Sequence, residues 1–513
     1  MRFQMKAVQN IMRIVQLIVL LAVPLDAFAL APGRFNGGAL NNRAVLRGRA
    51  RATLPSLAAE ALPSALGAPE AINTVRTVTG GGNGDQAEDS EAHKSSMSQS
   101  VFNLVKNIMG AGMLSLPSGV AAFSDSRSAV LPAAGIIAVL GALSAYTFVL
   151  IGRSCAETKA ESYEQSWART VGQKTAWLPA GACVATCFAG CLAYSIIIGD
   201  SFSALAKTFG APAVVAKRSN VILAVTTTVL LPLSLLKNLK SLGFTSMLGT
   251  SGLFYTAVMM AIRFFDGSYA VGGRFHSILP AGGAPVFGAK GANPICFLVL
   301  VSMLSTAYEA HFNAPLFYRE LKNSTVPRYT KMVSASFLIS VVTMTAVTAF
   351  GFLTFGGSSS GFILNNYANS DRLAALARIF VATSIIFSYP LCFVGLRDGI
   401  REMRGTRPGE PKGRTAWTVG LLGFVTAASL KLSDLGFVNS FAGALVGSGI
   451  IYIFPALMFL RPLRNKLATG AVKLTAGIRR EMAANNGILV TGAVMGILGA
   501  AVSVLEAFTN VLG

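Results

Sequence analysis

Long apolar runs dominate the chain from residue 99 onward and alternate with short polar segments. Each run has about 20 residues, the length that an α-helix needs to cross a hydrocarbon core roughly 30 Å thick. The pattern predicts eleven membrane-spanning helices and therefore an all-α polytopic membrane protein. The expected spans are 99–123, 129–151, 176–205, 219–236, 242–265, 293–318, 330–355, 373–396, 415–432, 435–460 and 487–510.

Composition agrees with a membrane location. Hydrophobic residues make up 53% of the 513 residues and charged residues 13%, against roughly 25% charged residues in an average soluble domain. The formal net charge of +21 would suggest nucleic-acid binding in a soluble protein, but here the lysines and arginines lie mostly in the loops between spans. The expected surroundings are a lipid bilayer, and no nucleic-acid partner is expected.

The basic loops are those that follow even-numbered spans. They are 153–174, 236–240, 318–331, 397–414 and 461–480. Loops rich in lysine and arginine stay on the cytosolic side of a membrane. The chain is therefore expected to hold these loops and its N-terminal part on the cytosolic or stromal side, with the C-terminus opposite.

The first 75 residues are typical of targeting sequence rather than of a folded domain. Residues 1–27 combine a basic start, a ten-residue apolar core too short to span a membrane, and small residues suited to cleavage, which together predict a signal peptide. From Phe28 to Ala59 the chain carries five arginines and no acidic residue, and such a composition is typical of an organelle transit peptide. We assign the transit peptide to residues 28–75 and a disordered polar linker to residues 76–98.

A signal peptide followed by a transit peptide resembles the two-part presequences of algae with complex plastids. The junction DAFALAP is similar to their Ala-Phe-Ala-Pro-like motif, although Leu30 interrupts it. The expected location is thus a plastid envelope. The alternative is an ordinary secretory signal before a disordered basic segment, in which case the protein resides in an endomembrane or the plasma membrane.

The first span carries an interruption near its middle. Gly110, Ala111 and Gly112 stand where apolar residues are expected, and Pro117 follows. In hydrocarbon an unpaired backbone amide costs several kcal/mol, so a helix breaks only where the freed groups are buried in protein or line a cavity. Transporters use such breaks to present backbone groups to an ion and a substrate.

The sixth span carries a second interruption, in the segment STAYEAHFNAP, with Glu309, His311, Asn313 and Pro315. Two broken helices five spans apart predict an inverted repeat, with 99–265 as repeat one, 293–460 as repeat two and 487–510 as an extra helix.

Close helix packing is the alternative explanation for the glycines. The polar residues of the two spans favour function, because such side chains are costly in a bilayer and rarely lie there without a role. In span one these residues are Asn103, Lys106 and Asn107.

Five segments carry a family resemblance. In chain order they are SVFNLVKNIMGAGMLSLPSG, PLSLLKNLKSLGFTS, AYEAHFNAPLFYREL, GFLTFG and SYPLCFVGLRD. Over residues 99–460 the chain resembles the amino acid/auxin permease family, and is similar to its neutral and proton-assisted amino acid transporter branches. The resemblance implies the fold of the bacterial leucine transporter and secondary transport of amino acids by alternating access, driven by a sodium or proton gradient.

The resemblance also implies a substrate site at the two breaks. The segment from Asn107 to Leu114 would hold the carboxylate and amino groups of the substrate, and the segment from Ala307 to Asn313 would supply carbonyls and walls of the side-chain pocket. The residues expected to bind substrate are Asn107, Gly110, Ala111, Gly112, Met113, Thr306 and Ala307.

In sodium-coupled members of the family the ion lies between spans one and eight. The corresponding positions here are Asn107 and the hydroxyls of Thr383, Ser384 and Ser388. The alternative for these hydroxyls is a bond to their own helix backbone.

Lys106 is a departure from the sodium-coupled members, which typically have a small residue before this asparagine. The sequence VKNIMGAG resembles the proton-assisted branch instead. An ammonium group near the sodium position would repel a second cation in a low-dielectric site, and removal from water favours its neutral form. We therefore expect H⁺ coupling or sodium-independent exchange ahead of Na⁺ coupling.

Other roles remain open for the charged residues of the spans. Lys106 could pair with Glu309 or reach the interface through its long stem. His311 could carry a proton, because its imidazole titrates near neutral pH, or could only hydrogen-bond a loop. Glu309 and His311 are thus further candidates for ion coupling, while Arg378, early in span eight, is expected at the interface.

Two other classes of protein compete with a carrier. Some members of the family are amino acid sensors, but these tend to carry a structured soluble extension, whereas here the extension is typical of targeting sequence. An enzyme is not expected, because no catalytic pair, metal-spaced cluster or phosphate-binding loop is found. Cys183, Cys187 and Cys191 share a helix face and are interpreted as packing residues rather than metal ligands. No cofactor beyond the coupling ion is expected, and the fold suffices as a monomer.

Overall fold

The computed structural model describes residues 94–236, 245–279, 283–289, 293–406, 410 and 413–512. The predicted signal and transit peptides and most of the predicted linker lie outside these residues and stay predictions. The described residues belong to one compact unit. They are almost entirely helical, with two isolated β-bridges among them. The expectation of an all-α protein is confirmed.

In the first repeat, spans one and four each consist of more than one helical segment. The helices of this repeat are α3 (Met97–Ile108), η2 (Ala111–Ser115), α4 (Leu116–Phe123), η3 (Arg127–Ala129), α5 (Val130–Thr158), α6 (Tyr163–Thr170), η4 (Gln173–Thr175), α7 (Trp177–Thr208), α8 (Ala213–Ala216), α9 (Arg218–Val225), η5 (Thr226–Leu230), α10 (Leu231–Leu235) and α11 (Thr245–Phe265).

The second repeat and the last helix follow along the chain. The helices of this part are η7 (His276–Ile278), η8 (Pro294–Cys296), α12 (Phe297–Ala307), η9 (His311–Asn313), α13 (Ala314–Glu320), α14 (Val326–Phe355), η10 (Ile363–Asn366), α15 (Arg372–Met403), α16 (Arg414–Lys431), α17 (Leu435–Ala442), η11 (Gly443–Gly447), η12 (Gly449–Ile453), α18 (Phe454–Ala468) and α19 (Ala476–Leu512).

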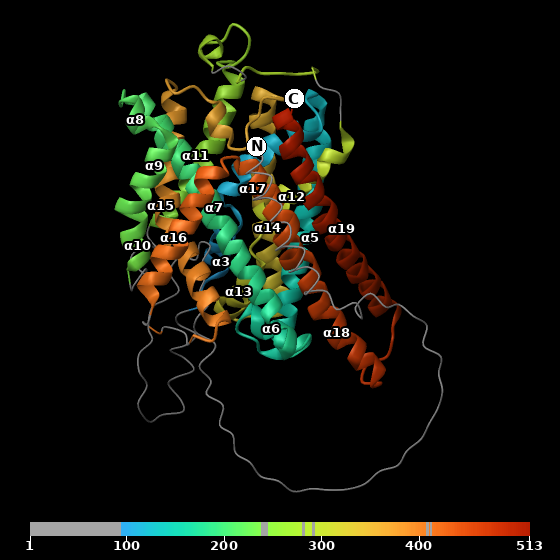
Figure 1. Cartoon of the computed structure of the whole chain (residues 1–513). Helices are drawn as coiled ribbons and strands as arrows, with labels where there is room; N and C mark the ends of the chain where they lie inside the picture. The colour runs from blue at the N-terminus through green and yellow to red at the C-terminus, as the bar shows by residue number, and fades with distance from the viewer. Residues whose placement is uncertain are drawn as a thin grey trace, which may run out of the picture. The chain divides into compact units, whose positions relative to one another are not determined.

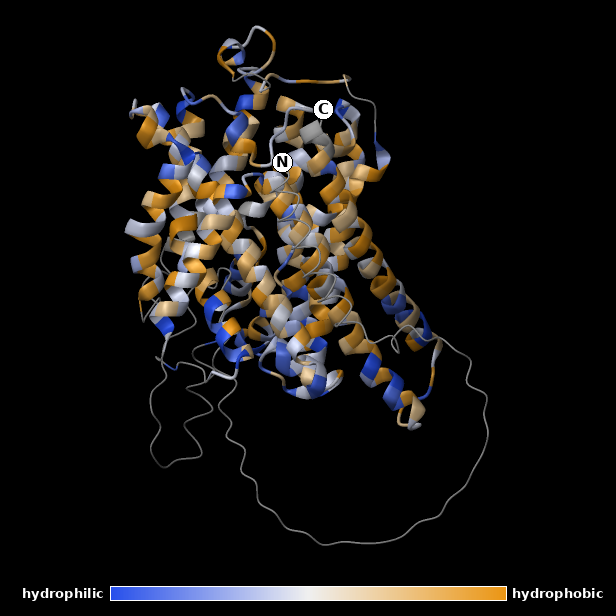
Figure 2. Ribbon diagram, in the orientation of Figure 1, coloured by the Kyte–Doolittle hydropathy of each residue, from blue (hydrophilic) through white to orange (hydrophobic). Residues whose placement is uncertain are grey.

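Eight helical segments in the described part of the chain are long and apolar enough to cross a membrane. The other three expected spans contain the broken α3 to α4 segment, α11 and α16. The total of eleven spans therefore stays a prediction. Figure 2 shows hydrophobic residues along the helices and hydrophilic residues gathered at α6 and toward the end of α18, as expected where chain leaves a bilayer.

Several helices run beyond the predicted spans. The α5 helix continues to Thr158, α15 to Met403 and α18 to Ala468, and α19 begins at Ala476 rather than at 487. Helical hydrogen bonding does not need to stop at the edge of the hydrocarbon, because polar side chains can continue the same helix in the headgroup region. The basic segment 461–480 is thus mostly helical rather than a loop, and the basic segment 153–174 contains α6.

The contacts between helices follow the expected inverted repeat. Equivalent spans of the two halves pack on each other: α4 on α12, α5 on α14, α7 on α15, and α9 and α10 on α16. Figure 1 shows α9 and α10 at one edge of the bundle. Cross contacts occur in matching pairs as well, since α4 contacts α14 while α12 contacts α5, and α11 contacts α15 while α17 contacts α7. A two-fold relation that exchanges spans one to five with spans six to ten produces this set of contacts.

Span ten is locally widened. Its segments η11 and η12 are π-helical turns, a distortion often found at functional sites. Gly443 allows the widened turn to lie directly against α12, because a Cβ atom there would stand 1.9 Å from the carbonyl oxygen of Ser302.

Arg378 corrects one sequence prediction. It was expected at the interface, but only 1% of it is exposed. Its Nη2 donates hydrogen bonds to the carbonyl oxygens of Leu364 and Tyr367, at 2.8 and 2.6 Å. These carbonyls belong to the loop around η10, which contacts η2. Carbonyl groups of buried, non-helical backbone need hydrogen-bond donors. Arg378 supplies them and so fixes the loop beside the first break.

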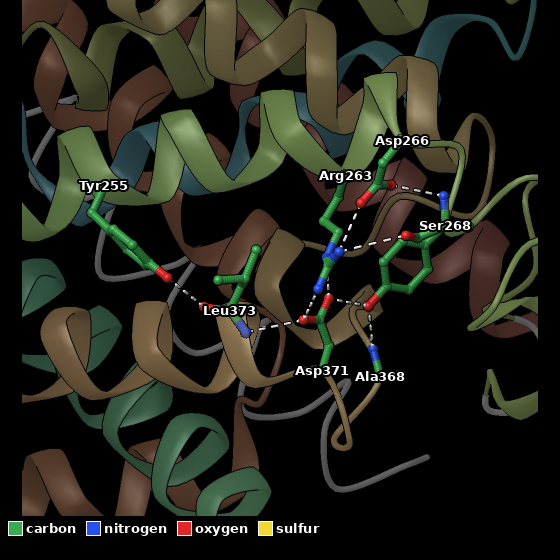
Figure 3. Close-up of polar contacts among 8 residues, drawn as sticks. Tyr255, Arg263, Asp266, Ser268, Ala368, Asp371 and Leu373 are labelled. Carbon is green, nitrogen blue, oxygen red and sulfur yellow. Dashed lines mark hydrogen bonds and ion pairs between the residues drawn. The ribbon is translucent and has the colours of Figure 1, made fainter.

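A polar network joins the end of α11 to the start of α15 (Figure 3). Asp371, fully buried, accepts hydrogen bonds from Arg263 Nη2 at 2.7 Å and Nε at 2.9 Å, and from the Tyr269 hydroxyl at 2.8 Å. The same carboxylate caps α15 by accepting from the Leu373 amide at 3.0 Å. Because every oxygen of this carboxylate is engaged, the two helices are held at fixed positions.

The Arg263 guanidinium also reaches the loop beyond α11. Its Nη1 lies 2.7 Å from Asp266 Oδ2, and the Ser268 amide donates to Asp266 Oδ1 at 2.8 Å. Burial acts to raise the pKa of the Asp266 carboxyl, but the hydrogen bonds from Ser268 and the nearby guanidinium hold that pKa below its usual range. The network therefore extends as an ionised cluster into the loop.

Candidate functional site

The first predicted break is present. The α3 helix ends at Ile108, and Gly110 is extended, with φ −96° and ψ 176°. A tight 3₁₀ turn, η2, follows before α4 begins at Leu116, with Pro117 in its first turn. Nothing lies within 4 Å of a Cβ atom built on Gly110, so the backbone at the break adjoins open space.

The second predicted break is present in span six. The α12 helix ends at Ala307, and Glu309 follows before the turn η9 and the short helix α13. Pro315 stands in the first turn of α13, where its missing amide costs nothing. Each broken span therefore consists of two helical pieces joined by a 3₁₀ turn.

The two breaks face each other. A Cβ atom on Gly112 would lie 3.9 Å from the Thr306 side chain and 4.0 Å from the Ala307 backbone. Asn313 Nδ2 donates to Asn107 Oδ1 at 3.2 Å, which links the end of α3 to the turn η9.

A cavity of about 150 Å³ lies at the breaks. Its walls come from α3 and η2, α7, α11, α12, α15, α17 and η11. The lining residues are Lys106, Asn107, Ile108, Met109, Gly110, Gly112, Thr186, Ala189, Gly190, Ala193, Tyr194, Leu253, Thr306, Ala307, Glu309, Val381, Ser384, Ile385, Ser388, Asn439, Ala442 and Val446.

Most of the residues expected to bind substrate line this cavity. They are Asn107, Gly110, Gly112, Thr306 and Ala307. Met113 is fully buried and is not among the lining residues, and the side chain of Ala111 lies outside the described part of the chain. Successive side chains of a 3₁₀ turn point in different directions. The sequence does not show where this turn begins, so it could not predict that Met113 does not line the cavity.

The cavity wall carries two charged side chains, Lys106 and Glu309. Lys106 belongs to the last turn of α3 and is only 7% exposed. The hydrogen bond recorded for the Glu309 carboxylate comes from Thr186 Oγ1 of α7, at 2.7 Å to Oε1, rather than from Lys106.

Two of the three expected hydroxyls of α15 line the cavity. Ser384 and Ser388 do so and Thr383 does not, because residues four apart share a helix face. No hydrogen bond of Ser384 or Ser388 is recorded with any described residue, whereas Ser302 bonds back to the Leu298 carbonyl at 2.7 Å. Both hydroxyls can therefore offer their oxygens to the cavity.

His311 lies apart from the cavity. It is fully buried, and its Nε2 lies 3.0 Å from both Thr147 Oγ1 and the Ser144 carbonyl oxygen of α5. Its ring packs edge-on against Phe148. The partner of His311 is thus a helix rather than a loop, and its position suits fixing the break against α5 more than carrying a proton through the cavity.

Sequence reasoning missed a polar residue from span ten. The Asn439 carbonyl accepts from Thr306 Oγ1 at 2.6 Å, and its Nδ2 donates to Ser115 Oγ at 3.0 Å. Asn439 thus ties both broken spans to α17. An asparagine inside an apolar span is costly, and this signal could have identified it. Thr186 gave no such signal, because threonines are common in membrane helices.

The cysteines line no part of the cavity. Cys183, Cys187 and Cys191 are buried along α7, and the Cys392 thiol of α15 donates to the Cys187 carbonyl at 3.3 Å. Within the described ranges no group of three or more histidine, cysteine or acidic side chains is arranged to hold a metal ion.

Two broken helices that meet at a cavity between the helices, within an inverted repeat, define a membrane transporter. Residues 93–504 match the model of the family described as transmembrane amino acid transporter protein. The chain belongs to this family of amino acid transporters.

Relatives with assigned names agree with this membership. The sodium-coupled neutral amino acid transporter 7 of Danio rerio is 25% identical over 398 residues, which cover 73% of this chain and 81% of the relative. The vacuolar amino acid transporter 5 of Schizosaccharomyces pombe is 25% identical, with 79% and 93% covered. Among solved structures, the chain is similar to the inward facing conformation of Mhp1, with a TM-score of 0.48, 11% identity, and 82% and 92% of the two chains covered.

Proposed function

We propose that this amino acid transporter works as a monomeric secondary carrier that is coupled to protons or exchanges substrates independently of sodium. The observation that carries the proposal is the position of Lys106 on the cavity wall, beside Asn107 and in the same cavity as Ser384 and Ser388. These are the groups that would otherwise coordinate Na⁺ in a sodium-coupled member of the family.

Two unit charges about 4 Å apart repel by roughly 4 kcal/mol at an effective dielectric constant near 20. An ammonium group on the wall therefore weakens sodium binding in the same cavity. It can also take the place of the ion by donating hydrogen bonds to serine and backbone oxygens.

The substrate would span the two breaks. The backbone amides that follow Gly110 open the η2 and α4 segment, where the positive end of a helix favours a carboxylate. At the end of α12 the Thr306 carbonyl accepts from the Glu309 amide at 3.3 Å, whereas no backbone hydrogen bond to the Ala307 carbonyl is recorded among the described residues. The Ala307 carbonyl therefore suits an amino group. Both features border the cavity.

The deciding experiment uses the purified full-length chain in proteoliposomes. A panel of amino acids is tested in counterflow, and a sodium gradient or a pH gradient is then imposed separately. We expect accumulation that follows the pH gradient, or exchange that needs neither, with no response to sodium. Uptake driven by sodium and indifferent to pH would contradict the proposed coupling. An amino acid that stabilises the protein thermally but never crosses the membrane would indicate a sensor instead.

We also propose that residues 1–75 direct the chain to a plastid envelope. The support is the arginine-rich, acid-free composition after the signal peptide. A fluorescent reporter fused to residues 1–75 is expected at the plastid in an alga with complex plastids, while a reporter with residues 1–27 alone is expected to stay in the secretory pathway. Secretion of the longer fusion, or its retention in an endomembrane, would refute the plastid address.

A further inference from the structure

We propose that Glu309 selects substrates with a positively charged side chain, so that the cavity takes cationic amino acids, the shorter ones first. This inference rests on the proposed carrier function and names its substrate class. It starts from Glu309, the one acidic side chain among the described residues that line the cavity.

Glu309 stands in the break itself, between the end of α12 and the turn η9. Its Oε1 accepts the hydrogen bond from Thr186 Oγ1 at 2.7 Å, which directs the carboxylate toward α7. Glu309 and Ala307 both line the cavity, so the carboxylate borders the same space as the Ala307 carbonyl.

The second oxygen of this carboxylate has no recorded partner among the described residues. Two other buried acidic side chains lie close to an arginine: Asp371, at the start of α15, to Arg263 and Asp200, in α7, to Arg218, both at 2.7 Å. None of the ion pairs in the described part of the chain includes Glu309. A carboxylate inside a membrane protein is costly unless a cation or a proton accompanies it. A cation carried by the substrate would meet this need.

The neighbouring face of α7 leaves room for such a side chain. Ala189, Gly190 and Ala193 line the cavity on the same side of the helix as Thr186, as their spacing of three to seven residues requires. A substrate whose carboxylate lies at Gly110 and whose amino group lies at Ala307 can extend its side chain along this face. The cavity volume of about 150 Å³ is small, so we expect ornithine and lysine ahead of arginine.

Lys106 is the other charge on the wall, and it comes from a different segment. It belongs to α3, whereas Thr186 orients Glu309 toward α7. A cationic side chain that extends along α7 therefore approaches the carboxylate from the side of α7. Lys106 also repels a cationic side chain in this cavity, so binding of such a substrate depends on the Glu309 carboxylate to offset that repulsion.

The test compares substrates that differ in one charge. Lysine and norleucine share a carbon chain, and only lysine carries the terminal ammonium. For the full-length wild-type chain in proteoliposomes, we expect lysine to be preferred at least about tenfold, as a charge-assisted hydrogen bond at a buried site implies. In the Glu309→Gln variant, the KM for lysine should rise about tenfold or more and the preference should disappear, while norleucine uptake changes little.

Two comparisons keep the test decisive. Glu161→Gln, at an exposed carboxylate 3.8 Å from Arg319, removes a negative charge that is not part of the cavity lining and should leave the preference intact. Thermal stabilisation of the wild-type chain by lysine, measured against norleucine, gives a readout that does not depend on the folding of any variant.

The outcomes separate this inference from the proposed function. Transport of neutral amino acids only, with Glu309→Gln unchanged, would overturn the substrate class and leave the carrier function standing. Selective stabilisation by lysine without any uptake would support the substrate class and contradict the carrier. If Glu309→Gln abolishes proton-driven uptake of norleucine and lysine alike, the carboxyl serves the coupling proton and the substrate class is overturned.

Discussion

Replacing Lys106 by serine is expected to make transport respond to sodium and to remove its response to a pH gradient. The ammonium group lies on the cavity wall beside Asn107, and its removal takes away its repulsion of a cation that binds near the oxygens of Ser384 and Ser388. Relief of a repulsion of roughly 4 kcal/mol would strengthen sodium binding by up to about a thousandfold. The measurement is uptake by Lys106→Ser proteoliposomes under separate sodium and pH gradients.

Lys106→Arg is the matched control. Arginine keeps the positive charge and does not release its proton in proteins. If the ammonium only substitutes for sodium, the arginine variant remains independent of sodium and still exchanges substrate. If Lys106 also carries the coupling proton, the same variant loses accumulation driven by the pH gradient. A Lys106→Ser variant that folds, transports and ignores sodium would refute the role of this residue in coupling.

The breaks could be predicted from the sequence because their residue types conflict with a continuous membrane helix. Glycines, prolines and charged groups within an apolar run are costly unless the backbone is meant to open, and both breaks lie where this conflict is found. The pairing of the two halves followed from the five-span interval between the breaks. The contacts of α4 with α12 and of α7 with α15 agree with that expectation.

The remaining walls of the cavity could not be predicted, because they depend on which helices meet. Thr186 approaches Glu309 only when α7 packs beside the second break, and Leu253 of α11 joins from a helix without a distinctive motif. His311 and Arg378 are the opposite case, since their residue types drew attention in the sequence but neither lines the cavity. A buried, hydrogen-bonded side chain and a functional one have the same residue type in the sequence, and only their partners distinguish them.

Two glycines of the first span are expected to respond in opposite ways to substitution, and the pair tests whether the cavity at the breaks is the substrate site. Gly112 faces the cavity, where a Cβ atom would make ordinary contacts at 3.9 to 4.0 Å with Thr306, Ala307 and Asn439. Gly112→Val should therefore fold, because its first carbon has room. Its two methyl groups would occupy space that the substrate needs, and we expect affinity to fall by about tenfold to a hundredfold, as an overpacking cost of about 1–3 kcal/mol implies.

Gly119 lies one helical segment further along and serves as the control. A Cβ atom there would stand 2.9 Å from Met303 Sδ and 3.1 Å from the Leu300 backbone, so Gly119→Ala forces α4 and α12 apart and should cost about 1–3 kcal/mol of stability. Melting temperature and substrate-induced stabilisation are measured for both variants. Gly112→Val should keep the melting temperature and lose the stabilisation, and Gly119→Ala should do the reverse. A Gly112→Val variant that binds substrate normally would place the site elsewhere in the molecule.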